Sequence, residues 1–304
     1  MVQIDWAEQA GRLRASAEGE AGWNTTVATS LVRETDRVAV DVGCGGGGMA
    51  KALAEALTAD ATVVAIDSDP DVLEQAREHT AGAVRCELAS MDDGAEPLRK
   101  AIDAPADLIW AAGAVHHAAD QQAAVDALAS LLAPGGRLAL AESGLPARSL
   151  PWDLGVGEPG LELRLDHAQD RWFKAMRESL PGTVPMPYGW TDALTRAGLS
   201  DVTTRSILTE TPAPLSDEER DRVVTQFRHR VERLTLDAEP THGHGGGHGH
   251  GHGHVSPGDG EWLRPDDLAT WERLLDPDGD QYLGRRTDLF VLSVRSIHLG
   301  HAPR

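Results

Sequence analysis

The feature that most constrains the fold is a glycine-rich loop that directly follows a short apolar run. Residues 38–42 read VAVDV, and residues 43–48 read GCGGGG. A β-branched apolar run of this length is typical of a strand buried on both faces. Glycines between a strand and a helix let a ligand approach the main chain closely. The sequence therefore predicts a ligand-binding turn at the carboxyl end of a buried strand.

Segments typical of strands and of helices alternate along the chain. Further strands are expected at 62–66, 84–88, 108–110, 137–141, 202–208 and 288–297. Helices are expected within 5–35, after the glycine loop, from Pro70, at about 120–132, 161–180 and 191–198, after the capping box at Ser216, and from Pro265. Strands that alternate with helices indicate a parallel sheet with helices on both faces.

The same patterns divide the chain into parts. An N-terminal helical segment (1–35) precedes a ligand-binding core (36–143). Residues 144–190, rich in proline and tryptophan, are expected to form a helical lid over the substrate; the alternative is a helical cap that completes the core. Segments 191–211 and 285–298 supply the last two strands of the core. Between them, residues 212–284 are expected to form a helical insertion with a disordered His/Gly-rich loop at 241–255.

The net charge and the composition indicate which kinds of molecule the protein is unsuited to bind. The 304-residue chain has a net charge of −20, which disfavours binding to nucleic acid or to an anionic membrane. No apolar run approaches the roughly 18 residues of a membrane span, and the first residues lack the pattern of a secretory signal. The two cysteines, Cys44 and Cys86, indicate a reducing compartment. We expect a cytoplasmic protein that acts on a small molecule, and its oligomeric state stays open.

The acid ahead of the glycine loop bears on which ligand the loop binds. Gly43, Gly45 and Gly48 have the spacing of a dinucleotide site, but the spacing also suits a ligand without a phosphate. Asp41 lies just before them. Its carboxylate would repel a pyrophosphate and attract the ammonium group of an amino acid.

A second acid, Asp67, lies at the end of the next strand. An acid about 20 residues after such a loop accepts hydrogen bonds from ribose hydroxyls. The alternative for Asp67 is to cap the helix that begins at Pro70, and Asp69 is better placed for that.

Taken in order, residues 38–48, Asp67, 107–117 and 131–140 resemble the class I S-adenosylmethionine-dependent methyltransferases. The strand pair 202–208 and 288–297 is similar to the terminal antiparallel hairpin of that family. The resemblance implies an α/β fold with a doubly wound, seven-stranded Rossmann-like sheet and an inserted helical cap. It also implies an enzyme with S-adenosylmethionine as its cofactor.

The resemblance further implies a cofactor site at the ends of the strands, built from Asp41, Gly43, Cys44, Gly45, Asp67, Ser68, Ser90, Met91 and Ala111. Asp41 would face the amino group, residues 43–45 would line the methionine part, and Asp67 would hold the ribose. Ser68 would lie beside the adenine, and Ala111 near the sulfonium. Ser90 stands where the family commonly has an acid for the adenine amino group, so Ser90, Met91 or Asp92 would serve instead.

Three histidines are candidates for proton transfer. Methyl transfer needs an aligned nucleophile, and a hydroxyl or a protonated amine also needs a base. His116 and His117 follow the fourth strand; the alternative is that one packs in the core and the other touches the cofactor. His167 lies in the aromatic-rich segment.

We therefore expect a methyltransferase that acts on an O or N atom of a small, apolar or aromatic metabolite. A nicotinamide-dependent oxidoreductase is one alternative, because it would share the glycine loop. A metal-binding protein on a methyltransferase-like scaffold is another. It is suggested by six histidines alternating with glycines over 242–254. Imidazoles on such a chain bind Zn²⁺ or Ni²⁺ without a set geometry, so we expect adventitious binding and predict no metal site.

Overall fold

The computed structural model describes residues 6–236 and 262–304, except the side chains of Glu8, Ser143 and Leu236. These residues form two compact units. The larger unit contains residues 6–144, 180–207 and 295–304, and the smaller unit contains 145–179, 208–236 and 262–294. The His/Gly-rich tract at 241–255 lies outside the described residues, so the predictions about it stay predictions.

A seven-stranded sheet runs through the larger unit, in the order β3-β2-β1-β4-β5-β7-β6. Its strands are β1 (Val38–Val42), β2 (Thr62–Asp67), β3 (Arg85–Leu88), β4 (Ala106–Ala112), β5 (Leu132–Arg148), β6 (Ser200–Thr211) and β7 (Val291–His301). The first five pair in parallel. Thr204 contacts His298 and Ser206 contacts Ser296, so β7 runs antiparallel to β6. Main-chain hydrogen bonds show that β7 also runs antiparallel to β5. The predicted doubly wound sheet with a terminal antiparallel pair is confirmed.

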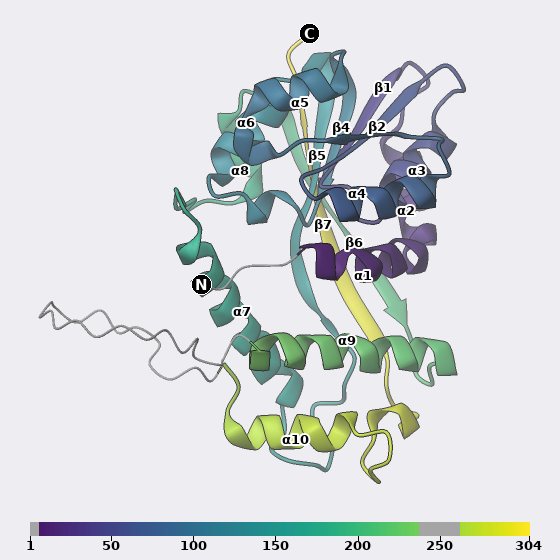
Figure 1. The fold of residues 1–304 in the computed structure, drawn as a ribbon, viewed down its shortest axis with the longest axis vertical. Coiled ribbons are helices and arrows are strands. Elements are labelled where there is room, and N and C mark those ends of the chain that lie inside the picture. Colours follow the sequence, from purple (N-terminus) through teal and green to yellow (C-terminus); the bar gives the residue numbers. More distant parts are fainter. Residues whose placement is uncertain (1–5, 237–261) are drawn as a thin grey trace, which may run out of the picture. The chain divides into compact units, whose positions relative to one another are not determined.

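Helices cover both faces of this sheet (Figure 1). They are α1 (Trp6–Gly19), α2 (Ala21–Leu31), α3 (Gly48–Ala56), α4 (Pro70–Thr80), α5 (Ala95–Ile102), α6 (Gln121–Ala129) and α8 (Trp190–Arg196), with short 3-10 turns η1 (Met91–Asp93) and η2 (Val115–His117). Side chains of α2, α3 and α4 pack on Ala39, Ala65 and Trp110, whereas α5, α6 and α8 pack on the alternate positions, such as Val40 and Ile109. Burial on both faces explains why the central strands read as continuous apolar runs.

Local signals in the sequence correctly mark the start of α4 but miss α5. Asp69 is the N-cap of α4, and its Oδ1 accepts hydrogen bonds from the N–H groups of Asp71 and Val72. No helix is predicted between the third and fourth strands from the sequence. In α5 the buried residues are Leu98, Ala101 and Ile102, a helical pattern only one turn long within a charged segment.

The smaller unit is mainly helical, with α7 (Leu161–Ser179), α9 (Asp217–Leu236), α10 (Pro265–Leu275) and the turn η3 (Leu283–Arg285). The capping box ahead of α9 is present: Ser216 N–H donates to Glu219 Oε2 at 2.8 Å, and Glu219 N–H donates to Ser216 Oγ at 3.3 Å. Phe227 of α9 stacks on the buried Trp271 of α10, with ring centroids 5.0 Å apart. Whether residues 144–190 act as a lid over the substrate stays a prediction.

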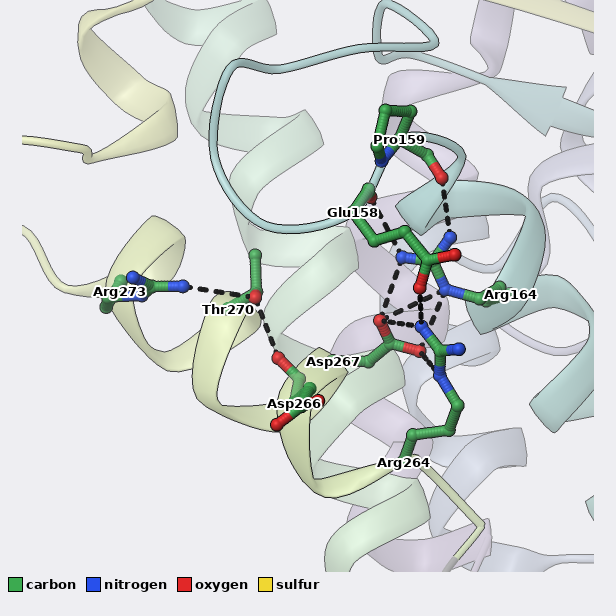
Figure 2. A network of polar contacts seen from close by, with 8 residues as sticks. All are labelled: Glu158, Pro159, Arg164, Arg264, Asp266, Asp267, Thr270 and Arg273. Atoms are coloured by element: carbon green, nitrogen blue, oxygen red, sulfur yellow. Dashed lines mark hydrogen bonds and ion pairs between the residues drawn. The ribbon is translucent and has the colours of Figure 1, made fainter.

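An ion-pair network around the buried carboxylate of Asp267 joins α7 to α10 in the smaller unit. Figure 2 shows the guanidinium groups of Arg164 and Arg264 meeting at the carboxylate of Asp267. Arg164 donates through Nε at 2.9 and 3.0 Å and through Nη2 at 2.8 Å, and Arg264 donates at 2.8 and 3.1 Å. Arg164 also donates to the carbonyl oxygens of Glu158 and Pro159, which holds the loop ahead of α7.

Among residues 6–236 and 262–304, no helix is both long and apolar enough to cross a bilayer. In the same residues there is no group of three or more His, Cys, Asp or Glu side chains that could hold a metal ion.

Candidate cofactor and catalytic site

The glycine loop turns the chain sharply from β1 into α3. Gly43, Gly45 and Gly47 have φ angles of +68°, +51° and +76°, a region that favours glycine. A Cβ on Gly43 would lie 2.5 Å from the Cβ of Ala114, and a Cβ on Gly46 would lie 2.5 Å from the carbonyl oxygen of Leu13. Gly43 and Gly46 are therefore required because Ala114 and Leu13, which lie in other segments, pack on the loop. Gly45 is required by its φ angle alone, since its nearest neighbour would lie 3.8 Å from the added Cβ.

Asp41 is buried near the end of β1, and one of its two carboxylate oxygens lacks a hydrogen-bond donor among the described residues. Its Oδ2 has no hydrogen-bond partner among the described residues. Burial raises the pKa of this carboxyl to about 7; the Ala50 N–H acts to lower it, and the nearby Asp67 adds to the rise. A buried polar atom without a partner is costly. The arrangement therefore suits a ligand that brings a cation or a donor to Asp41.

Asp67 lies at the end of β2 and faces the same loop. Its Oδ2 accepts a hydrogen bond from Gly45 N–H at 3.1 Å, and its Oδ1 accepts one from Asp69 N–H at 3.2 Å. Burial raises its pKa, although hydrogen bonds from Gly45, Asp69 and Ser68 oppose the rise. Because Asp69 is the N-cap of α4, Asp67 is not needed as a cap.

The other predicted cofactor residues lie at the carboxyl ends of the parallel strands. Cys44 is buried in the loop, Ala111 is buried near the end of β4, and Ser68 is exposed after β2. Ser90 follows β3 and is the N-cap of η1, its Oγ accepting a hydrogen bond from Asp92 N–H at 3.2 Å. Met91 is half-buried at the start of this turn. The fold thus gathers these residues at one edge of the sheet, but their roles toward a cofactor stay predictions.

The two adjacent histidines in η2 have different surroundings. His116 Nδ1 lies 2.5 Å from Glu142 Oε2. Glu142, at 1% exposure, also accepts hydrogen bonds through Oε1 from the N–H groups of Ala114 and Val115, at 3.0 and 2.7 Å. His117 instead meets the indole of Trp6 edge to face, with ring centroids 5.1 Å apart. The two imidazole rings lie 4.1 Å apart.

Sequence reasoning missed Glu142 and Trp6. The position of Glu142, an acid at the end of the fifth strand beside the loop that follows the fourth, could have signalled the first. Nothing local to Trp6 indicates its contact with a residue more than 100 positions away. His167 lies exposed on α7 in the smaller unit, and its proposed role stays a prediction.

Residues 40–138 match the family model described as a methyltransferase domain. The chain contains a methyltransferase domain. The match covers most of β1, the glycine loop, strands β2 to β4 and the start of β5. The match and the strand order both agree with the resemblance to the class I S-adenosylmethionine-dependent methyltransferases.

Known methyltransferases are similar to parts of this chain. Trans-aconitate 2-methyltransferase of Methylobacterium radiotolerans is 35% identical over 143 residues, 43% of this chain and 52% of that protein. The ubiquinone biosynthesis O-methyltransferase of Xylella fastidiosa (strain 9a5c) is 39% identical over 102 residues, 33% of this chain and 39% of that protein. The chain thus spans about half or less of the length of these curated relatives. Phosphoethanolamine N-methyltransferase 2 of Haemonchus contortus, solved with S-adenosyl-L-methionine, aligns at 14% identity with a TM-score of 0.47, covering 99% of this chain and 61% of that one.

S-adenosylmethionine is the cofactor that the sequence resemblance implies, and the residues present fit it. Its amino-acid end is a cation that Asp41 Oδ2 can accept. Gly45 is the one loop glycine named above at which an added Cβ would meet its neighbours only at van der Waals distance, and Asp67 offers carboxylate oxygens beside it. A pyrophosphate placed against the same two acids would be repelled.

Proposed function

We propose that this chain transfers a methyl group from S-adenosylmethionine to an O or N atom of a small, apolar or aromatic metabolite. The observation that carries the proposal is Asp41: a buried carboxylate with one unpartnered oxygen, next to a glycine turn, within a methyltransferase domain. Desolvating a carboxylate is unfavourable unless a partner compensates for it. The ammonium group of the cofactor supplies that partner.

Each cofactor-binding residue has a distinct task in this proposal. Asp41 binds the amino group, residues 43–45 line the methionine part, and Asp67 holds both ribose hydroxyls. Ser68, Ser90 and Met91 contact the adenine, and Ala111 lies near the sulfonium. When bound, S-adenosylmethionine supplies an electrophilic methyl group. The chain aligns the acceptor atom with that group and excludes water.

The acceptor must lose a proton if it is a hydroxyl or a protonated amine. His116, His117 and His167 are the residues we propose for this step, because imidazole takes up protons near neutral pH. Both O-directed and N-directed enzymes occur among the similar proteins, and the proposal covers both kinds of acceptor.

The substrate class rests on residues 144–190. Trp152 and Leu145 are each 69% exposed, and Leu163 is 48% exposed. Large apolar side chains left in water favour contact with an apolar ligand or partner. We propose that this segment covers the substrate, and that the protein acts in the cytoplasm, where its cysteines Cys44 and Cys86 stay reduced.

Calorimetry with two ligands tests the proposal. We expect S-adenosylhomocysteine to bind and NAD⁺ not to bind. Binding of NAD⁺ alone would favour the oxidoreductase and overturn the proposal. The acceptor is then sought by incubating the protein with a metabolite extract and isotopically labelled S-adenosylmethionine, followed by detection of labelled products.

A further inference from the structure

We propose that helix α1 covers the methionine end of the cofactor site and must be docked on the glycine loop for the cofactor to bind tightly. The inference rests on the proposed function, because it adds a wall to that site. It depends on how closely the main chain of α1 approaches Gly46, on the contacts of Leu13 and Trp6, and on the small side chains that hold α1 in place.

The main chain of α1 lies directly on Gly46. A Cβ added to Gly46 would lie 2.5 Å from the carbonyl oxygen of Leu13 and 2.7 Å from the Cα of Arg14. These are main-chain atoms, so a change of side-chain conformation would not relieve the overlap. Unlike Gly45 and Gly47, Gly46 has a φ angle outside the left-handed region. The turn can therefore keep its backbone with alanine at this position, and α1 is what a side chain there would displace.

Helix α1 contacts both segments that border the proposed site. Leu13 is half-buried, and its side chain would lie 3.8 Å from a Cβ on Gly45, which is proposed to line the methionine part. About two turns earlier in the helix, the indole of Trp6 meets the imidazole of His117 in η2, with ring centroids 5.1 Å apart. Helix α1 thus bridges the glycine loop and the turn after β4, beside which the methionine part and the sulfonium are proposed to lie.

The position of α1 is linked to the cofactor residues through the loop. On the α4 side, His79 Nδ1 lies 3.0 Å from the carbonyl oxygen of Gly46. One residue earlier in the loop, Gly45 N–H donates a hydrogen bond to Asp67 Oδ2 at 3.1 Å. A shift of Gly46 would therefore disturb both the main chain of Gly45 and the acid that is proposed to hold the ribose.

Small side chains hold α1 on the rest of the larger unit. The buried side chains described for this helix are those of Ala10 and Ala17, which remove little apolar surface from water. Arg14 Nη1 also donates a hydrogen bond to the carbonyl oxygen of Gln75 in α4, at 3.3 Å. A helix held by such contacts can leave its place at a low cost in free energy. Bound cofactor would add contact surface and shift α1 toward the docked position, where it also keeps water from the methyl group.

Alanine substitutions at two matched glycines test the inference. G46A should keep the fold and should lower the affinity for S-adenosylhomocysteine by about 5- to 150-fold, because α1 can no longer dock. G22A is the control: an added Cβ on Gly22 of α2 would meet nothing within 4 Å, and its φ angle is not in the left-handed region. G22A should keep the wild-type affinity. An equal loss in the two variants would overturn the inference.

A double variant tests whether Leu13 and Gly46 act through the same contact. L13A alone should lower the affinity by about 3- to 10-fold. G46A/L13A should bind no more weakly than G46A, because α1 is already displaced. Losses that simply add would mean that the two residues act separately, and the inference would fail.

Hydrogen exchange follows α1 in the wild-type protein, without any substitution. S-adenosylhomocysteine should slow the exchange of the main-chain amides of residues 6–19, and this slowing should be absent in G46A. Binding that leaves the exchange of these amides unchanged in the wild type would refute the role of α1. Should G46A not fold, this measurement and L13A decide. If the wild-type protein does not bind S-adenosylhomocysteine at all, the proposed function itself fails.

Discussion

Two buried aspartates, one in each unit, show opposite ways of placing a carboxylate inside a protein. Asp267 in the smaller unit is surrounded by donors from Arg164 and Arg264 (Figure 2). Asp41 in the larger unit has an oxygen with no partner among the described residues. Burial acts to raise the pKa of both. For Asp267 the hydrogen bonds from the two arginines outweigh burial and the pKa is lowered, whereas for Asp41 burial prevails and the pKa rises to about 7.

The difference separates a structural carboxylate from a binding one. A buried ion pair that is complete within the chain has nothing further to bind, and its removal is felt as lost stability. A buried carboxylate that is incomplete costs stability, and a ligand can recover that cost. Substitutions at these aspartates and their neighbours therefore distinguish the two kinds of carboxylate.

Replacing Asp267 by alanine should have the largest effect. Two guanidinium groups would lose the carboxylate that they share, and we expect about 3–5 kcal/mol of lost stability, measured by chemical denaturation. The exposed pair of Arg286 and Asp288 is the control, since D288N should cost at most about 1 kcal/mol. Equal losses in the two variants would mean that the Asp267 network is not structural.

Replacing Asp41 by asparagine should weaken binding and strengthen the ligand-free fold. Loss of a buried charge partner should reduce affinity for S-adenosylhomocysteine by about 2–4 kcal/mol, measured by calorimetry. Without ligand, D41N should be more stable than the wild type by about 1–3 kcal/mol at pH 8, because no buried charge remains. A variant that loses stability and keeps its affinity would place Asp41 in the same class as Asp267.

Replacing Asp67 by alanine should weaken cofactor binding by about 1–3 kcal/mol through lost charge-assisted hydrogen bonds. The expected loss is smaller than for Asp41 because Asp67 already accepts two main-chain N–H groups. Unchanged affinity in calorimetry would refute the ribose role. Asp69→Ala is the control, because it removes the cap of α4 and should change stability more than affinity.

The pH dependence of binding should follow Asp41. Its pKa in the folded protein, about 7, lies above the ordinary 3.8, so folding favours the protonated form. The associated stability is present at low pH and is lost as pH rises through 7. Binding of an ammonium group needs the carboxylate, so affinity for S-adenosylhomocysteine should rise roughly eightfold from pH 6 to pH 7.5. D41N should show a flat profile over this range, and a wild-type profile equally flat would contradict the assignment.

Local sequence signals predicted most of the strands and the starts of two helices. The run at 38–42 and the glycines after it predicted β1 and its turn, and Asp69 and the Ser216 capping box predicted where helices begin. Both kinds of signal depend on neighbouring residues alone. The helix α5 was missed because its three buried residues span a single turn, too short a pattern to stand out from the charged residues around it.

The candidate site could be predicted only in part, for a related reason. Asp41, Asp67 and residues 43–45 belong to one strand–loop–helix pattern and the strand after it, so their order along the chain places them together. Glu142 and His116 are 26 positions apart, and their pairing depends on how β4 and β5 end beside each other.

The order of apolar runs, turns and caps was thus enough to specify the α/β sheet, the glycine turn and the pair of acids beside it, because hydrophobic periodicity and backbone preference act over a few residues. The contact of Glu142 with His116, the edge-to-face contact of Trp6 and the satisfaction of Asp267 by two arginines depended on the folded chain. Hydrogen bonds and ring contacts act over a few ångströms in space, and folding alone brings residues distant in sequence within that range.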